Sequence, residues 1–189
     1  LTGVLYVCDE PSIGLHPVDN HLLINTLLEL RDLGNTILIV EHDESIMRAS
    51  DNIIDLGPGA GNKGGNLIAQ GEPNKIHLSE DSLTGQYLSG KKKIDFPLKR
   101  RKGSNLNITV KGARENNLSD IDIEIPLGKI VCVTGVSGSG KSTLVNEIIY
   151  KNISKLLYKT KEIPGECDEI IGIENIDKVI NIDQTPIGR

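Results

Sequence analysis

The chain has 189 residues, of which 38% are hydrophobic and 25% charged, an ordinary composition for a soluble globular protein of one large or two small domains. No apolar run approaches the length of a membrane span, which argues against an integral membrane protein. A net charge of -5 and an aromatic content of 3% argue against a uniformly basic or base-stacking nucleic-acid surface, although a local basic patch stays open.

Three widely spaced cysteines, Cys8, Cys132 and Cys167, indicate neither a C-x-x-C metal site nor a disulfide framework. We expect them to be reduced core residues of a cytosolic protein. The chain has no signal peptide, and it opens at Leu1 only a few residues before a strand, which we interpret as a cut end.

The first predicted element is an apolar strand at 4–8 that ends in Asp9 and Glu10. This is a Walker B pattern, in which an acid at the carboxyl end of a buried strand holds Mg²⁺ and the next acid polarises the attacking water. We assign the first role to Asp9 and the second to Glu10. Taken alone, the pattern also describes a strand that simply ends in solvent.

A tight loop then leads to a helix that begins at Pro17, and a second apolar strand follows at 36–40. Strand, helix and strand predict a right-handed parallel crossover with both strand ends at one edge. His42 is therefore expected beside the Walker B acids, where an imidazole can hydrogen-bond a γ-phosphate or orient water. The alternative is an ordinary surface histidine.

Residues 43–90 are predicted to form a trailing lobe of short elements around a glycine-rich turn at 57–61. The turn lacks the G-K-[ST] sequence of a phosphate loop, so we interpret it as part of a structural hairpin region. The expected helices and strands lie at 44–49, 52–56, 66–69, 72–77 and 83–88.

Residues 91–105 have the composition of a linker, with basic side chains at 91–93 and 99–102. We favour a solvated connector over the alternative, contact with DNA phosphates. Beyond the linker, apolar and polar residues alternate in 106–110 and in 118–125, which predicts an antiparallel strand pair at the edge of a nucleotide domain. Residues 130–133 are predicted to form a buried parallel strand.

That strand feeds a run that fits the P-loop pattern G-x-x-x-x-G-K-[ST] without a mismatch. Its glycines let backbone N–H groups wrap a polyphosphate, Lys141 reaches the β- and γ-phosphates, and Ser142 completes the Mg²⁺ shell. A strand before and a helix after the run argue against a merely glycine-rich turn. The expected nucleotide contacts are Gly135, Ser137, Gly138, Ser139, Gly140, Lys141, Ser142 and Thr143.

Residues 151–178 are poorly patterned, and the last predicted element is a strand at 178–183 that delivers Gln184 to the P-loop edge as a ligand of Mg²⁺ or water. Walker B stands far ahead of Walker A, so the domain is either circularly permuted or part of a tandem protein. We favour the tandem arrangement. It predicts an α/β P-loop NTPase with a mostly parallel sheet and an antiparallel edge pair, present as two half-heads at 1–90 and 106–189 around the linker 91–105.

The sequence resembles the UvrA family of excinuclease ABC proteins over nearly the whole chain, and five runs carry this resemblance: 1–7, 9–16, 40–43, 135–143 and 182–189. The runs around Walker B and the terminal glutamine are more specific than the P-loop. The resemblance implies Asp9 for Mg²⁺, Glu10 as catalytic carboxylate, Ser12 and Gly14 in the D-loop and His42 as switch histidine of head one, with Lys141, Ser142 and the Q-loop Gln184 in head two.

The resemblance further implies a cytoplasmic tandem ATPase of the ABC type that uses ATP and Mg²⁺. It implies that the full-length protein recognises damaged double-stranded DNA and loads the excinuclease B subunit in nucleotide excision repair. The implied protein forms a homodimer and has no membrane partner. The family's signature motif, zinc fingers and excinuclease B-binding domain lie outside this segment, so hydrolysis is expected of the full-length protein and not of the segment alone. Two departures are Cys8, where an aliphatic residue is expected, and the lack of an adenine-stacking aromatic at 113–116.

Two other classes remain as alternatives: the ATP-binding subunit of an ABC transporter, and a nucleotide-binding module without activity. Two heads joined by a basic linker, together with the terminal run, argue against the transporter. Salt-sensitive DNA binding would indicate the DNA-repair ATPase, whereas copurification with a membrane partner would indicate the transporter subunit.

Overall fold

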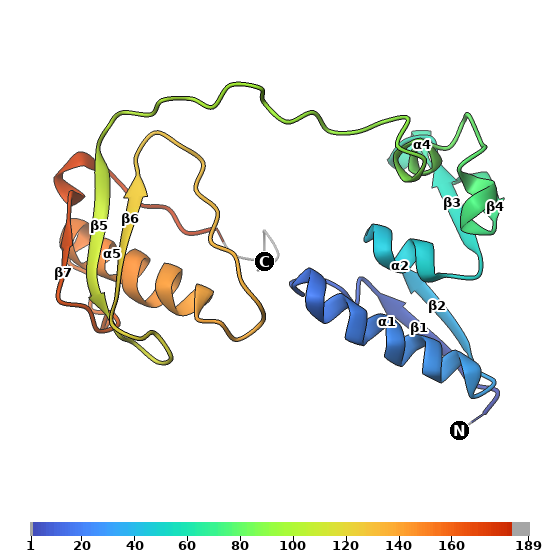
Figure 1. Ribbon diagram of the computed structural model, residues 1–189, viewed down its shortest axis with the longest axis horizontal. Helices are drawn as coiled ribbons and strands as arrows, with labels where there is room; N and C mark the ends of the chain where they lie inside the picture. Colours follow the sequence, from blue (N-terminus) through green and yellow to red (C-terminus); the bar gives the residue numbers. More distant parts are fainter. Residues whose placement is uncertain (1, 183–189) are drawn as a thin grey trace. The chain divides into compact units, whose positions relative to one another are not determined.

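The computed structural model describes residues 2–182 and divides into two compact units, Leu1–Pro97 and Leu98–Arg189. The boundary falls within residues 91–102, which are exposed and form neither helix nor strand (Figure 1). Across residues 2–182, no helix is long and apolar enough to cross a membrane.

The first unit opens with a parallel strand pair, β1 (Leu5–Asp9) and β2 (Thr36–Val40), connected by helix α1 (Pro17–Asp32). The register places the last residues of the two strands opposite each other, so both strands end at one edge and the predicted parallel crossover is confirmed. Side chains alternate between a half-buried face and an exposed face that includes Val7, 68% exposed. Figure 1 shows α1 lying along this pair.

The rest of the first unit consists of short elements, and those predicted for 43–90 are all confirmed to within a few residues. Strand β3 pairs antiparallel with β4 across the glycine-rich turn, and the apolar side chains of Ile46, Ile76 and Leu88 are buried. The elements are α2 (Glu44–Ala49), β3 (Ile53–Gly57), η1 (Gly61–Lys63), β4 (Asn66–Gly71), α3 (Pro73–Ile76) and α4 (Leu83–Leu88).

The second unit contains an antiparallel sheet in the order β6–β5–β7 and a two-part helix. Its core joins the two, since Val110 and Ala113 of β5 are fully buried against Ile148 of the helix. The predicted antiparallel pair is thereby confirmed. The elements are β5 (Asn107–Ala113), β6 (Ile121–Pro126), the π-helix η2 (Thr143–Tyr150), its continuation α5 (Lys151–Tyr158), β7 (Glu169–Ile171) and η3 (Ile173–Asn175).

Two predicted strands are absent from the described residues. The run 130–133 has no strand pairing and is exposed, Ile130 at 99%, and 178–182 is irregular, with the backbone of Val179 bonded to the Tyr158 hydroxyl. A strand exists only where a neighbour takes its backbone hydrogen bonds, and no described strand flanks either run. Cys132 is exposed for the same reason, so its prediction as a core residue is wrong.

The expectation of a mostly parallel sheet is also not met. Among the described strands only β1 and β2 pair in parallel, and the other pairings are antiparallel. The chain is therefore a mixed α/β protein with one small parallel sheet and two antiparallel ones.

Candidate functional site

The carboxyl ends of β1 and β2 bring two predicted site residues together in the first unit. Glu10 Oε1 lies 3.3 Å from His42 Nε2. The Glu10 N–H donates to the Val40 carbonyl at 2.9 Å, which extends the pairing one residue past Asp9, whose side chain is exposed at the strand end. The φ of Glu10 is 45°, a conformation that costs a non-glycine residue about 1–3 kcal/mol.

A carboxylate that the sequence analysis did not assign, Glu41, lies between these features. Its Oε1 accepts the backbone N–H of Ser12 at 2.9 Å, and its Oε2 accepts those of His42 at 2.8 Å and Asp43 at 3.1 Å. Partial burial raises the pKa of Glu41, but hydrogen bonds from the Ser12 side chain and from these backbone groups outweigh it, so the pKa lies below its ordinary value. One carboxylate thus joins the loop after β1 to the loop after β2.

The loop of His42 is held on its other side by Asp43, the N-cap of α2. Asp43 Oδ1 accepts the backbone N–H groups of Ser45 and Ile46, and its Oδ2 accepts Asn20 Nδ2 at 2.9 Å. Asn20 belongs to α1 and is 7% exposed, so the contact fixes the loop to the helix that crosses between the strands.

The predicted D-loop residues lie in consecutive turns after β1. The Ile13 N–H donates to the Glu10 carbonyl and the Leu15 N–H donates to the Ser12 carbonyl, at 3.1 and 3.0 Å. Gly14 has a φ of 75°, which glycine adopts without strain. Ser12 is therefore held both by its turn and by Glu41.

In the second unit, the P-loop directly precedes η2, and the side chain of Lys141 folds back onto the loop. Lys141 Nζ donates to the carbonyls of Gly135 and Val136, each at 2.8 Å. Gly140 has a φ of 96°, and a Cβ there would lie 2.9 Å from Asn117 Oδ1. Only glycine fits this position.

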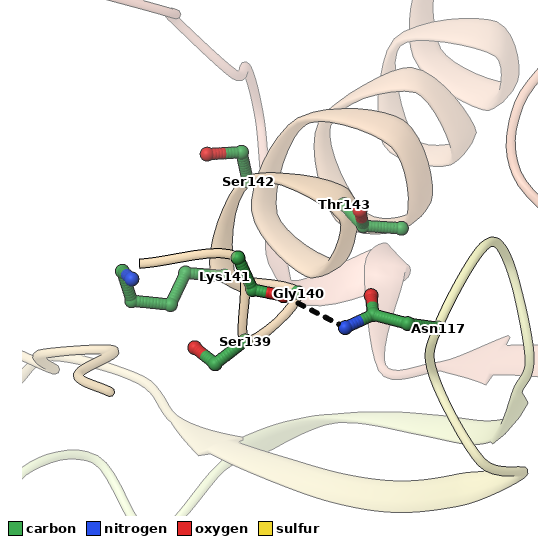
Figure 2. A pocket seen from close by; sticks show the side chains of 7 residues that line it. Asn117, Ser139, Gly140, Lys141, Ser142 and Thr143 are labelled. Carbon is green, nitrogen blue, oxygen red and sulfur yellow. Dashed lines mark hydrogen bonds between the residues drawn. The ribbon is translucent and has the colours of Figure 1, made fainter. Parts of the chain in front are cut away.

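Two amide side chains from the turn between β5 and β6 contact the loop. Asn117 Nδ2 donates to the Gly138 carbonyl at 2.9 Å, and Asn116 Nδ2 lies 3.4 Å from Thr143 Oγ1. Figure 2 shows Asn117 approaching the loop from the side of Thr143, while Lys141 points the opposite way. The sequence analysis missed Asn117, although it directly follows the run 113–116 in which an adenine-stacking aromatic was sought.

The P-loop surrounds an open hollow of about 160 Å³ lined by Asn117 and Gly138–Thr143. Sites for drug-sized ligands occupy about 300–1,000 Å³, so this hollow is smaller than a site that encloses a whole nucleotide. Hydroxyl, amide and ammonium groups line it, and no carboxylate does, which suits an anion.

The remaining predicted residues divide as follows. Ser137, Ser139 and Ser142 are exposed on the P-loop and at the start of its helix, and Gln184 lies outside the described residues. Within residues 2–182, no group of three or more histidine, cysteine or acidic side chains is placed to hold a metal ion. The contacts of Asp9 and Ser142 with Mg²⁺ therefore stay predictions.

Comparison with known proteins gives a consistent assignment. No family model matches the chain, but all 189 residues align with UvrABC system protein A of Clostridium tetani at 62% identity, of Clostridium perfringens at 59% and of Staphylococcus aureus at 59%, in each case over 20% of that protein. The crystal structure of UvrA2 from Deinococcus radiodurans superposes on the whole chain with a TM-score of 0.89 and 38% identity, over 22% of its own length. The chain thus belongs, in sequence and in fold, to the UvrABC system protein A family, and it spans about a fifth of the length of the relatives it matches.

Proposed function

We propose that the chain supplies parts of two ATP sites to an ABC-type ATPase of nucleotide excision repair. Residues 1–90 are the back half of a first head, 91–105 a linker and 106–189 the front half of a second head. The observation that carries the proposal is the approach of Glu10 to His42, 3.3 Å apart at the end of a parallel strand pair, in a chain that matches UvrA relatives over its full length.

At the first site, Glu10 is the group that polarises the attacking water. Its strained backbone and its contact with His42 hold the carboxylate at the strand edge, where water and the γ-phosphate meet. His42 Nε2 has a second role, a hydrogen bond to a γ-phosphate oxygen. Asp9, at the end of the same strand, is the residue that would hold Mg²⁺.

At the second site, Lys141 exchanges the loop carbonyls of Gly135 and Val136 for the β- and γ-phosphate oxygens when ATP enters. The carbonyls hold the ammonium beside the hollow before ATP arrives, which limits the reorganisation needed. The Ser142 hydroxyl and Gln184 are the groups that would hold Mg²⁺ there.

For the whole protein we propose recognition of damaged double-stranded DNA, loading of the excinuclease B subunit, homodimer formation and a cytoplasmic location. Support comes from relatives named for the UvrABC system. The same relatives disfavour the alternative of an ABC transporter component.

The first test replaces the P-loop lysine in the full-length protein. Lys141→Ala removes a charge-assisted contact to the phosphates and should weaken ATP binding at the second head about 10- to 100-fold. Titration with a fluorescent ATP analogue measures this, with Lys155→Ala, an exposed change on α5, as the matched control. Unchanged affinity in Lys141→Ala would sink the assignment of the second site.

The second test separates binding from hydrolysis at the first head. Glu10→Gln keeps the shape and loses the charge, so ATP binding there should be spared while turnover falls about 100-fold or more. Phosphate release under single-turnover conditions is the measurement. Turnover that survives at this head would mean that Glu10 is not the catalytic carboxylate.

A further inference from the structure

The loop after β1 and the loop after β2 are far apart in sequence, yet they share one hydrogen-bond acceptor. Ser12 and His42 each donate a backbone N–H to the carboxylate of Glu41, one to each oxygen. A shift of either loop therefore displaces the group that holds the other.

The two carboxylate oxygens of Glu41 accept hydrogen bonds from different loops. Oε1 faces the D-loop through Ser12, and Oε2 faces the switch loop through His42 and Asp43. An ionised carboxylate accepts at both ends, whereas a carboxamide of the same length accepts at one end and donates at the other. Charge at Glu41 is thus required to hold both loops at once.

The contact reaches the reacting groups through one side chain. The side chain of His42 is 80% exposed and lies 3.3 Å from Glu10. Because few neighbours pack against the imidazole, its position depends mainly on the backbone of His42. That backbone is fixed on one side by Glu41 and on the other by the Asp43 cap of α2. A displacement of about 1 Å at a reacting group can cost about 100-fold in rate.

We propose that Glu41 is a positioning residue that couples the D-loop to the switch histidine and sets the place of His42 against Glu10. The proposal rests on the proposed ATPase function of the first site. It predicts that a movement of the D-loop at Ser12 changes the position of His42 through the carboxylate of Glu41.

The experiment compares Glu41→Gln with Glu44→Gln in the full-length protein. Glu44 is the control because it is an exposed glutamate, three residues further along the chain. Among the contacts found, its carboxylate pairs only with Arg48. Glu41→Gln should remove most of the turnover that Glu10→Gln removes, about 10- to 100-fold, with the KM for ATP changed less than about twofold. Glu44→Gln should leave both constants unchanged. Full turnover in Glu41→Gln would overturn the proposal.

A double variant distinguishes positioning from a general loss of structure. If Glu41 acts through His42, then Glu41→Gln added to His42→Ala should cause no further loss of turnover. Losses that multiply would show an independent, structural effect and would count against the proposal.

Hydrogen exchange supplies a readout that does not depend on activity. The amides of Ser12 and His42 should exchange faster in Glu41→Gln than in Glu44→Gln, and equal exchange would contradict the coupling. If Glu10→Gln leaves turnover intact, the proposed function of the site fails. If Glu10→Gln abolishes turnover while Glu41→Gln does not, only the coupling fails.

Discussion

Glu41 accepts three backbone N–H groups with one carboxylate, and this arrangement predicts how the first unit responds to acid. The pKa of Glu41 is lowered in the folded chain, so its contribution to stability is complete above the unfolded value of about 4.3 and is lost as pH falls through the lower folded value. We expect Glu41→Gln to lower the free energy of unfolding by about 1–2 kcal/mol at pH 7.

The measurement is denaturant unfolding of the wild type and the variant between pH 7 and pH 3. The difference in unfolding free energy should shrink below about pH 4.3, because the unfolded wild-type chain takes up a proton at Glu41 there while the folded chain does so only at lower pH. A difference that stays constant down to pH 3 would show that charge at Glu41 does not stabilise the fold. Glu44→Gln, at an exposed surface pair, should change stability by less than about 0.5 kcal/mol.

The residue scale also shows the limit of reading a site from a pattern. Glu10 and His42 were predicted to meet because both follow apolar strands that were expected to pair in parallel, and the pairing is confirmed. Glu41 was missed because its partner Ser12 is 29 residues away, and no local pattern reports which backbone N–H groups a carboxylate will accept.

At the scale of elements, Ser82 connects strand β3 to helix α4. Its hydroxyl donates to Asp55 Oδ2 at 2.6 Å and accepts the N–H of Gly85 at 2.7 Å, as the N-cap of α4, and the side chain is fully buried. Ser82→Ala removes both bonds and leaves the buried N–H of Gly85 without its acceptor. We expect unfolding to become easier by about 1–3 kcal/mol.

Thermal or denaturant unfolding followed by circular dichroism tests this expectation. Ser89→Ala is the matched control, because Ser89 is exposed and its hydroxyl bonds only a neighbouring helical carbonyl, that of Gln86, among the contacts found. Equal stability of the two variants would mean that the bonds of Ser82 do not stabilise the lobe.

The elements that were predicted correctly share a physical feature: each pairs or packs with residues close by in sequence. Strands β3 and β4 are joined by one turn, and β1 and β2 by one helix. The run 130–133 is as apolar as β1, and 178–182 contains three apolar residues, yet neither run pairs. A strand needs a neighbouring strand, and the pattern of a run does not report whether that neighbour is present. In contrast, α5 was missed because Lys, Asn and Ser interrupt its apolar residues, although Ile153 is buried.

At the scale of the whole molecule, the basic residues of the linker offer a direct test of what it touches. Residues 91–102 are exposed and irregular, as expected of a solvated connector. Replacing Lys99, Arg100, Arg101 and Lys102 by neutral residues in the full-length protein should leave DNA affinity nearly unchanged. If instead these side chains bind DNA phosphates, the variant should show a flatter slope of log affinity against log salt. The slope should change by about 0.9 for each phosphate contact that the variant has lost. A salt titration of both proteins therefore decides between the two interpretations.

The 189-residue chain by itself should hydrolyse ATP at a negligible rate, because Lys141 and the pair Asp9–Glu10 serve different ATP sites in our proposal. The sequence also contains no L-S-G-G signature run to complete either site. Phosphate release at saturating ATP, compared with the full-length protein at equal concentration, is the measurement. Turnover near the full-length rate that both Lys141→Ala and Glu10→Gln abolish would require the two residues to act on one nucleotide, and the chain would then be a circularly permuted head instead of two halves.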